Sequence, residues 1–527
     1  MKASLSWAAL VLLLLAQLSR LGKGTANPGF IARITKKGVE YARQYGVASV
    51  KKELSSLAIP DFSGSYDVSW FLSVTYEFRK LQIRDFQLPY SDLRLLPEHG
   101  VRATLSDSYL NLQGSWKVSK GFITLTGTFD VKVDDIYFSV TLNLGKNPSG
   151  RPTASVSHCS NSVGPVSVVI SGYLSWILNL FHHRIENNLK HFLENEMCDM
   201  IRKLATSQLQ PYLQTLPVTV MVDDVASIDY RLVGAPVVTS QALDTPFKAE
   251  FFYQGGLFPS SLHAPPIQLP QAHNRMVYFA VSEYVFNTAS WVYHQAGHMN
   301  FTLKNEHLEN FTKLMDNQQA RELRRKYLNP GCRQSANATV TSMASCHLSD
   351  FLLGLMHIPL GSDIRLNTDS FQVAIPQLAR LYPKMELELD VSPESAPLLS
   401  FTTGDVTVQA VMDVQAFVLL PNSRKPVFQL RVSTNISATI IVKSTRISGS
   451  VSTGSKLKLE LKHSDIGSFN VELMENILNY FALHTIYPSL NAKLEEGFPL
   501  PLPRDTYISS LVFQIHQNFF LLGANIS

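Results

Sequence analysis

The strongest constraint on the fold is a long run of alternating apolar and polar residues between positions 114 and 144. In "FITLTGTFDVKV" and again in "IYFSVTLNL", nearly every second residue is apolar, and the residues between them are mostly threonine, serine or charged. This period of two is typical of antiparallel strands that bury one face. We therefore expect long antiparallel strands from about residue 65 to residue 170.

Helical periodicity flanks this strand region on both sides. In residues 27–57, apolar and small side chains recur every three to four positions, which predicts one long amphipathic helix. Its apolar face is small and contains glycine, so we favour a helix packed across a sheet over one that lies on a membrane. Residues 173–204 carry a second stripe of apolar side chains, and we expect a helix there as well.

The second half repeats this order of elements. Residues 258–273 are rich in proline and predict a linker, because proline interrupts both helices and central strands. Beyond them, "FQLRVSTNISATIIV" and "KLKLELK" alternate as strands do, and "VELMENILNYFALHTIYPSL" carries a helical stripe. The segments "LQPYL" and "IYPSL" also share a pattern, which favours an internal duplication.

The composition favours a binding protein. Hydrophobic residues make up 45% of the 527 residues and charged residues 17%, which indicates an apolar surface beyond the core that can hold lipid. A formal net charge of +4, without a basic and aromatic recognition motif, speaks against nucleic acid. Because the sequence has no nucleophile elbow, zinc-protease, phosphate-loop or dinucleotide motif, we expect no enzymatic activity.

One cluster has the spacing of a metal site. His182, His183 and Glu186 lie three and four residues apart on the second predicted helix. A metal site needs a further ligand from elsewhere, and none is evident nearby in the sequence. We therefore interpret the cluster as a solvated helix face and expect neither a metal nor a cofactor.

Several features indicate secretion. Residues 1–24 carry Lys2, an apolar stretch and small residues, as in a signal peptide cleaved within about 24–26. The apolar stretch is shorter than the ~20 residues of a membrane span, which speaks against an anchor. We expect a soluble extracellular chain, with glycosylation candidates at Asn300, Asn310, Asn337, Asn435 and Asn525.

Four cysteines can form disulfides in a secreted chain. Cys159, Cys198, Cys332 and Cys346 lack the spacing of a zinc site, so bridges are favoured over metal. Three pairings of four cysteines are possible. A bridge between Cys159 and Cys198 would join the second helix to the strand region.

Several segments resemble one known family. "NPGFIARITKKGVEYA", "IPDFSGS", "SQLQPYLQTLPVTV", "MVYFAVSEYVFNTASWVYHQAG", "LARLYPKMELEL" and "EGFPLPLP" are similar to the family of bactericidal/permeability-increasing protein and lipopolysaccharide-binding protein. The resemblance runs from about Asn27 to Asn525, apart from one segment. Within the family, "DVQAFVLLPNSRKPVFQLRVSTNISATI" and "FFLLGAN" side with the lipopolysaccharide-binding members.

The resemblance implies an α+β fold, an elongated boomerang of two barrel-like antiparallel β halves, each with long helices, joined through a central β-sheet. Residues 27–218 would form the N-terminal lipopolysaccharide-binding barrel and 219–257 strands of the central sheet. Residues 258–273 would be the linker, and 274–527 the C-terminal barrel with the remaining central strands. The resemblance also implies a Cys159–Cys198 disulfide and a bound phospholipid in an apolar pocket of each half.

In function, the resemblance implies a secreted, acute-phase plasma protein of innate immunity that transfers lipid. Such a protein binds the lipid A part of lipopolysaccharide, from aggregates or the Gram-negative outer membrane, and hands monomers to a monocyte receptor for Toll-like signalling. A directly bactericidal protein that permeabilises the outer membrane is the alternative. Residues 27–218 hold only 20 Lys and Arg against 16 Asp and Glu, so we favour the carrier.

The resemblance also places a cationic tip that meets the phosphates of lipid A. Its core is similar to the hairpin "GSWKVSKGFITLTG", residues 114–127, in which Lys117 and Lys120 match basic positions. Ser119 and Thr124 stand where further basic residues are common, and residues 70–78 are aliphatic and polar where a basic loop is usual. We therefore expect a phosphate contact that is weaker than the family suggests.

Residues 304–356 depart from the family, which has a short connection there. The segment lacks a sustained period and carries Cys332, Cys346 and two of the sequons. It is either a surface excursion closed by its own disulfide or a translated non-coding segment. We favour the second, because long loops without regular structure are uncommon inside compact domains.

Overall fold

The computed structural model describes most of the chain beyond its first 26 residues. The described ranges are 27–55, 59, 61–69, 72–171, 182–255, 261–305, 366–443, 446–452, 456–483, 487–496, 498–499 and 508–526. The predicted signal peptide, nearly all of the predicted insertion with Cys332 and Cys346, and the sequons at Asn310 and Asn337 lie outside these ranges.

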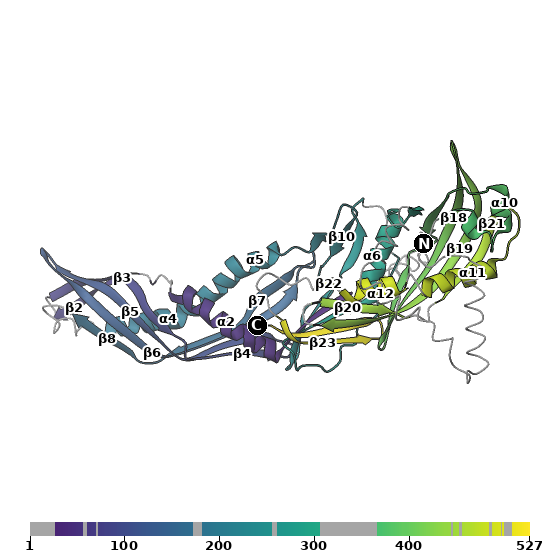
Figure 1. The fold of residues 1–527 in the computed structure, drawn as a ribbon. Coiled ribbons are helices and arrows are strands. Elements are labelled where there is room, and N and C mark those ends of the chain that lie inside the picture. Colours follow the sequence, from purple (N-terminus) through teal and green to yellow (C-terminus); the bar gives the residue numbers. More distant parts are fainter. Residues whose placement is uncertain are drawn as a thin grey trace, which may run out of the picture.

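The molecule is elongated, with a β-rich half at each end and a shared sheet between them (Figure 1). Strands predominate, and helices lie against the sheets of both halves. The predicted fold class, an α+β boomerang of two β halves joined through a central sheet, is confirmed.

The N-terminal half contains, over the described residues, a seven-stranded antiparallel sheet with the order β2-β3-β5-β6-β7, in which β4 pairs with β5 and β8 with β6. Its strands are β2 (Phe62–Ser69), β3 (Leu72–Gln87), β4 (Tyr90–Leu96), β5 (Gly100–Lys120), β6 (Ile123–Lys146), β7 (Pro152–Val163) and β8 (Val166–Ser171). Apart from Phe122, both alternating segments of the sequence lie in β6, where buried and exposed residues alternate from 128 to 133. The predicted long, one-sided strands are therefore confirmed.

Helix α4 covers the apolar face of this sheet. It spans His182–Leu204 and contacts β7 and β8, and it continues through a π-helical turn, Ala205–Leu209, into α5 (Gln210–Thr215). Leu189 and Leu193 of α4 are buried in the same cluster as Phe78, Trp116 and Phe129 of the sheet. The second predicted helix is thus confirmed over its described part, 182–204.

The first predicted helix is wrong at its start. Residues Phe30–Thr35 form strand β1, and the helix, α2, begins only at Lys36 and ends at Ser55. β1 pairs with β12 (Ala242–Phe247) on one side and β14 (Val277–Ser282) on the other, so tertiary pairing satisfies its backbone groups. Six residues are too few for the sequence alone to distinguish a period of two from the helical period that follows.

The central sheet combines segments from both ends of the chain. Its order is β11-β12-β1-β14-β24-β23, where β11 is Val237–Val238, β23 is Ile508–His516 and β24 is Phe519–Ile526. Ile31, Tyr278, Ala280, Phe519 and Leu521 form a buried cluster on it. Ile267 and Leu269, from the predicted linker, pack against this cluster, so the linker lies along the sheet.

Three strands of the segment 219–257 do not join the central sheet. β9 (Thr219–Met221), β10 (Ala226–Asp229) and β13 (Glu250–Tyr253) form a separate three-stranded sheet. The prediction that this whole segment supplies central strands is therefore wrong for them. The physical reason is that helix α6 (Glu283–Gln295) covers the small sheet, where Ala226 and Val292 are buried together.

Helix α6 also binds the edge of the C-terminal half. The Asn287 side chain donates to Leu399 O (2.9 Å) and accepts from Leu399 N (2.8 Å). The Glu283 carboxylate accepts the Phe401 N–H (2.7 Å), and burial raises the pKa of that carboxyl. α6 therefore joins the small sheet to strand β17 (Leu398–Thr402).

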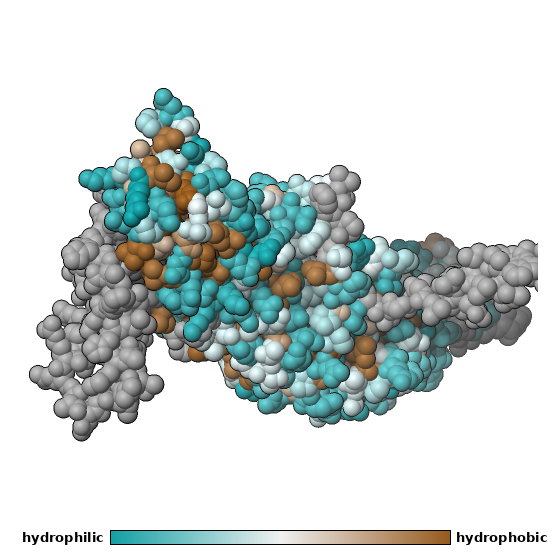
Figure 2. Space-filling view, turned by 90° about the vertical axis from the view of Figure 1, so that its right-hand side faces the viewer, coloured by the Kyte–Doolittle hydropathy of each residue, from teal (hydrophilic) through white to brown (hydrophobic). Residues whose placement is uncertain are grey.

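The C-terminal half, like the N-terminal half, consists of an antiparallel sheet accompanied by helices. In the part of it that the structure describes, an eight-stranded antiparallel sheet contains β15 (Phe301–Leu303), β16 (Leu387–Pro393), β17, β18 (Asp405–Leu420), β19 (Ser423–Lys443), β20 (Arg446–Val451), β21 (Leu457–Ser464) and β22 (Phe498–Pro499). Helices α10 (Pro376–Leu381), α11 (Val471–Phe481) and α12 (Tyr487–Glu496) accompany it. Figure 2 shows apolar side chains gathered below the projecting hairpin of this half.

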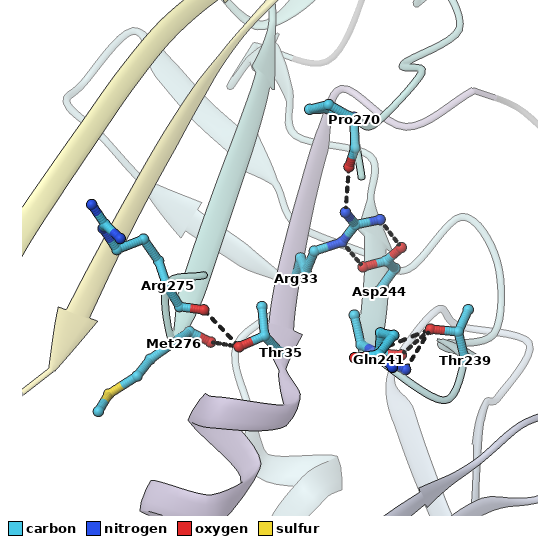
Figure 3. Close-up of polar contacts among 9 residues, drawn as sticks. Arg33, Thr35, Thr239, Gln241, Asp244, Pro270, Arg275 and Met276 are labelled. Carbon is cyan, nitrogen blue, oxygen red and sulfur yellow. Dashed lines mark hydrogen bonds and ion pairs between the residues drawn. The ribbon is translucent and has the colours of Figure 1, made fainter. Parts of the chain in front are cut away.

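A buried ion pair fixes β1 to its neighbour and to the linker (Figure 3). Arg33 donates from Nε to Asp244 Oδ1 (2.7 Å) and from Nη2 to Oδ2 (2.8 Å), and its Nη1 donates to Pro270 O (2.7 Å). Thr35 Oγ1 donates to the carbonyl oxygen of Arg275 (2.6 Å), which lies two residues before the start of β14. Together these contacts join the first strand, the linker and both sides of the central sheet.

Arg33→Met should destabilise the protein by about 3 kcal/mol, because it leaves the carboxylate of Asp244 without its partner in a largely buried site. Urea unfolding followed by circular dichroism measures the change. Lys37→Met is the matched control, since Lys37 is exposed and makes one hydrogen bond to Asn274 O (3.2 Å). Equal unfolding midpoints for the two variants would show that the ion pair does not hold the sheet.

Candidate functional site

The β5–β6 hairpin ends at the outer extremity of the N-terminal half, where β2, β3, β5 and β6 lie together (Figure 1). Lys120 pairs with Ile123, so the turn consists of Gly121 and Phe122 alone. Gly121 has φ +54°, a value that disfavours other residues, and it takes the first of the two turn positions. The predicted hairpin is therefore a tight turn on two long strands.

An aromatic core supports the hairpin from below. Trp116 is 3% exposed and lies opposite Gly127, where a Cβ atom would come within 2.5 Å of the indole ring. On its other side Trp116 is paired with Phe78 of β3. The Phe78 and Phe129 rings meet edge to face with centroids 5.3 Å apart. Gly127 is thus required for the close packing of Trp116, and the tip rests on a filled core.

The two predicted phosphate-binding lysines differ in position. Lys120 is exposed and is the last residue of β5. Lys117 lies on the outer face of the ladder, three residues before the end of the strand and opposite Glu77 of β3. The structure therefore places one lysine at the turn and the other on the side of the sheet.

Glu77 compensates the charge of Lys117. Its Oε2 lies 3.9 Å from Lys117 Nζ and also forms an ion pair with Arg79. Lys120 has no recorded ion pair among the described residues. A single carboxylate thus offsets two nearby cations, and Lys120 carries most of the charge that the hairpin presents.

The hydroxyl groups near the turn are also engaged. Ser119 and Thr124, the positions where the resemblance leads us to expect further basic residues, lie opposite each other, and their hydroxyl oxygens are 3.2 Å apart. Thr75 Oγ1 donates to Ser119 O (3.2 Å). The outer face beside the turn is therefore polar and uncharged.

The structure joins Cys159 to Cys198 by a disulfide, the pairing that the resemblance implies. Cys159 lies on β7 and Cys198 on α4, 39 residues later. The bridge ties the covering helix to the sheet, and in the loop-entropy model a loop of this size contributes roughly 3 to 4 kcal/mol.

The remaining predicted residues lie away from the tip. Asn300 precedes β15 and is exposed, and Asn435 is exposed on β19. Asn525 lies on β24, where its Oδ1 accepts the Met276 N–H (3.0 Å). Glycosylation at these positions stays a prediction.

His183 and Glu186 contact each other on α4, with Nδ1 and Oε2 3.4 Å apart. Among the residues that the structure describes, no group of three or more metal-ligating side chains is assembled. Across the same ranges, none of the helices combines the length and apolarity that crossing a bilayer requires.

A cavity of about 550 Å³ lies beside the linker. Its lining consists mostly of side chains with polar groups: Gln271, His273, Asn274, Tyr278 and Gln514, with Ala272 and Val512. A pocket for acyl chains needs a mainly apolar lining. This cavity therefore does not identify the predicted phospholipid sites, which stay a prediction.

Sequence reasoning missed two residues of the hairpin region. Glu77 meets Lys117 only because of the β3–β5 register, and nothing in the local sequence reports that register. Phe122 could have been noticed, because it follows a glycine between two alternating strands, which is the pattern of a two-residue turn.

Glu77→Gln should strengthen binding to vesicles that contain anionic lipid, because it leaves Arg79 and Lys117 without their shared counter-charge. We expect several-fold tighter binding at low ionic strength and no difference at high ionic strength, since salt screens exposed charges. Vesicle co-sedimentation at the two ionic strengths measures the effect.

Glu40→Gln is the control, because it removes a carboxylate from a similar exposed pair with Arg43 on α2. The same gain in both variants would mean that only total charge matters. No gain in Glu77→Gln would show that Lys117 and Arg79 do not face the lipid.

The chain matches both domains of one protein family. The N-terminal domain of the LBP / BPI / CETP family matches residues 38–214, and the C-terminal domain of that family matches residues 220–319 and 336–527. The unmatched residues 320–335 fall within the segment predicted as an insertion.

Individual proteins of this family are similar to this chain over nearly their whole length. Lipopolysaccharide-binding protein of Homo sapiens is 44% identical over 518 residues, which cover 98% of this chain and 96% of the relative. That of Bos taurus is 43% identical over 502 residues, covering 95% and 94%. Bactericidal permeability-increasing protein of Rattus norvegicus is 32% identical over 526 residues, covering 99% and 97%.

A solved structure shares the fold. A crystal structure of lipopolysaccharide binding protein superposes with a TM-score of 0.56 at 38% identity, covering 95% of this chain and 99% of the other. The similarity therefore includes both β halves and the sheet between them.

Proposed function

Because the chain belongs to the LBP / BPI / CETP family, we propose that it binds lipopolysaccharide through the lipid A part and transfers it as single molecules. The observation that carries this proposal is the similarity to proteins named lipopolysaccharide-binding protein, which extends over 98% of the chain. Binding and transfer require no bond to be made or broken, and no residue is assigned a catalytic role.

The tip supplies the polar part of the proposed contact. A phosphate group accepts charge-assisted hydrogen bonds from lysine, each worth about 1.5 to 3 kcal/mol. Lys120 is exposed at the turn, and Lys117, three residues earlier on the same strand, would contribute where a phosphate competes with Glu77 for it. The acyl chains would follow the apolar face of the N-terminal sheet, and phospholipid would occupy the comparable region of each half.

The biological setting follows from the same proposal. The protein would be secreted into plasma as an acute-phase component of innate immunity and would take lipopolysaccharide from aggregates or the Gram-negative outer membrane. It would then pass the monomer to a monocyte receptor that serves Toll-like signalling. The sequence features of a signal peptide and of sequons support this setting.

Two observations favour the carrier over a directly bactericidal protein. Identity is 44% to the human lipopolysaccharide-binding protein and 32% to the rat bactericidal permeability-increasing protein. In addition, Glu77 offsets the charge of Lys117 and Arg79 near the tip. Damage to an anionic outer membrane depends on strong cationic attraction, which this tip lacks.

Purified protein should move fluorescent lipopolysaccharide from micelles to the soluble receptor when there are far fewer protein molecules than lipopolysaccharide molecules. At the same protein concentration it should leave Gram-negative cells viable. Fluorescence dequenching measures the transfer, and colony counts measure survival. Killing without transfer would contradict the carrier and favour the bactericidal alternative.

The two lysines should contribute unequally to this activity. Lys120→Met should weaken lipid A binding at least about tenfold, the loss of one charge-assisted contact. Lys117→Met should cost less, because Glu77 already neutralises Lys117 in the free protein. Titration with fluorescent lipid A compares the two variants, which are matched in chemistry. A larger loss in Lys117→Met would place the phosphate on the side of the sheet instead of at the turn.

A further inference from the structure

Of the large apolar side chains that the structure describes, the most exposed is at the β5–β6 turn. Phe122 is 99% exposed, and the adjacent Ile123 is 55% exposed. Both follow Lys120 at the outer end of the N-terminal half. An aromatic ring in this position is fully hydrated, which costs free energy that burial in an apolar medium would recover.

The turn itself does not require phenylalanine. A two-residue turn with glycine first is satisfied by Gly121, and its second position is ordinarily polar. Phe122 has no positive φ, so its backbone accepts any residue. Since the side chain has almost no contact with the rest of the protein, folding does not explain it either.

The opposite end of the molecule provides a comparison within the same chain. The β18–β19 hairpin also closes with two residues, because Leu420 pairs with Ser423. Its turn is Pro421 and Asn422, the kind of residues that solvated turns normally carry. The two hairpins share one architecture, and only the N-terminal one ends in an exposed aromatic side chain.

We propose that Phe122, with Ile123, inserts among the acyl chains of the lipid surface from which the protein takes its ligand. The proposal rests on the proposed function and names the part of the tip that enters the lipid. Lys120 is placed to meet the phosphate layer while the ring goes deeper, as amphipathic tips do at a membrane interface. The hairpin is held from below by Trp116 and Phe78, so the ring needs no rearrangement to enter.

A lipid surface fits the tip better than a protein partner does. Stable protein interfaces bury at least about 1,000 Å² with an apolar centre. In the part of the tip that the structure describes, the exposed large apolar side chains are Phe122 and Ile123, the adjacent outer face carries the hydroxyl groups of Ser119 and Thr124, and Lys120 precedes the turn. A small apolar point with a cation beside it suits the boundary between head groups and acyl chains.

Phe122→Trp tests the insertion directly, because the new indole reports its own surroundings. The probe is a vesicle of phosphatidylcholine that contains lipid A, and wild-type emission is subtracted to remove the native tryptophans. We expect a blue shift of the added emission and its quenching by lipids brominated along the acyl chain. Binding of the protein without either change would overturn the insertion.

Phe122→Ser measures how much the insertion contributes. We expect vesicle affinity to fall about tenfold or more, the effect of one phenylalanine that stays in water, with no change in the urea midpoint. Tyr90→Ser is the control, since Tyr90 is 62% exposed on β4, away from the turn. Equal affinities for Phe122→Ser and wild type would overturn the proposal.

Failure of the insertion and failure of the proposed function give different results. Transfer of lipopolysaccharide by the wild-type protein is measured in parallel with the vesicle experiments. Transfer that persists without any emission change in Phe122→Trp counts against the insertion alone. Insertion without transfer counts against the carrier function, and the absence of both overturns both.

Discussion

β1 pairs with β12 on one side and with β14 on the other, and this double pairing places the first described strand in the middle of the sheet between the two halves. The Arg33–Asp244 ion pair and the bond from Arg33 to Pro270 O fix that strand and the linker together. Helix α2 begins directly after β1, and α6 begins directly after β14. The positions of both halves therefore depend on this one strand.

At the tip of the N-terminal half, charge attraction and apolar contact act at different distances from the lipid. Glu77 reduces the attraction that Lys117 and Arg79 would exert at long range, which leaves Lys120 as the main cation. Phe122 is placed to act only at contact distance, since hydrophobic burial has no long range. A carrier that must leave a lipid surface again is served by a weak attraction combined with a small apolar anchor.

The elements with long, regular patterns could be predicted from the sequence. The alternation along β6 and the apolar stripe of α4 each extend over many residues, so their periods are unambiguous. β1 could not be predicted, because six alternating residues precede a helical pattern and only pairing with distant strands reveals a strand. The small sheet of β9, β10 and β13 likewise depends on its contact with α6.

The candidate site, like the fold, could be predicted only in part from the sequence. The hairpin, its lysines and its turn could be located from the sequence, because they depend on local alternation and on Gly121. The approach of Glu77 to Lys117 could not, since it joins residues on β3 and β5 whose register results from the whole sheet. A count of the hairpin lysines alone therefore overestimates the positive charge that the tip presents.

Analytical ultracentrifugation of the protein mixed with aggregated lipopolysaccharide tests the central claim, that the protein removes single lipid molecules. A carrier should shift labelled lipopolysaccharide from the fast-sedimenting aggregate to a slow complex of one protein with one lipid molecule. Lipopolysaccharide that stays in the aggregate at every protein concentration, with the protein bound to its surface or free in solution, would contradict it.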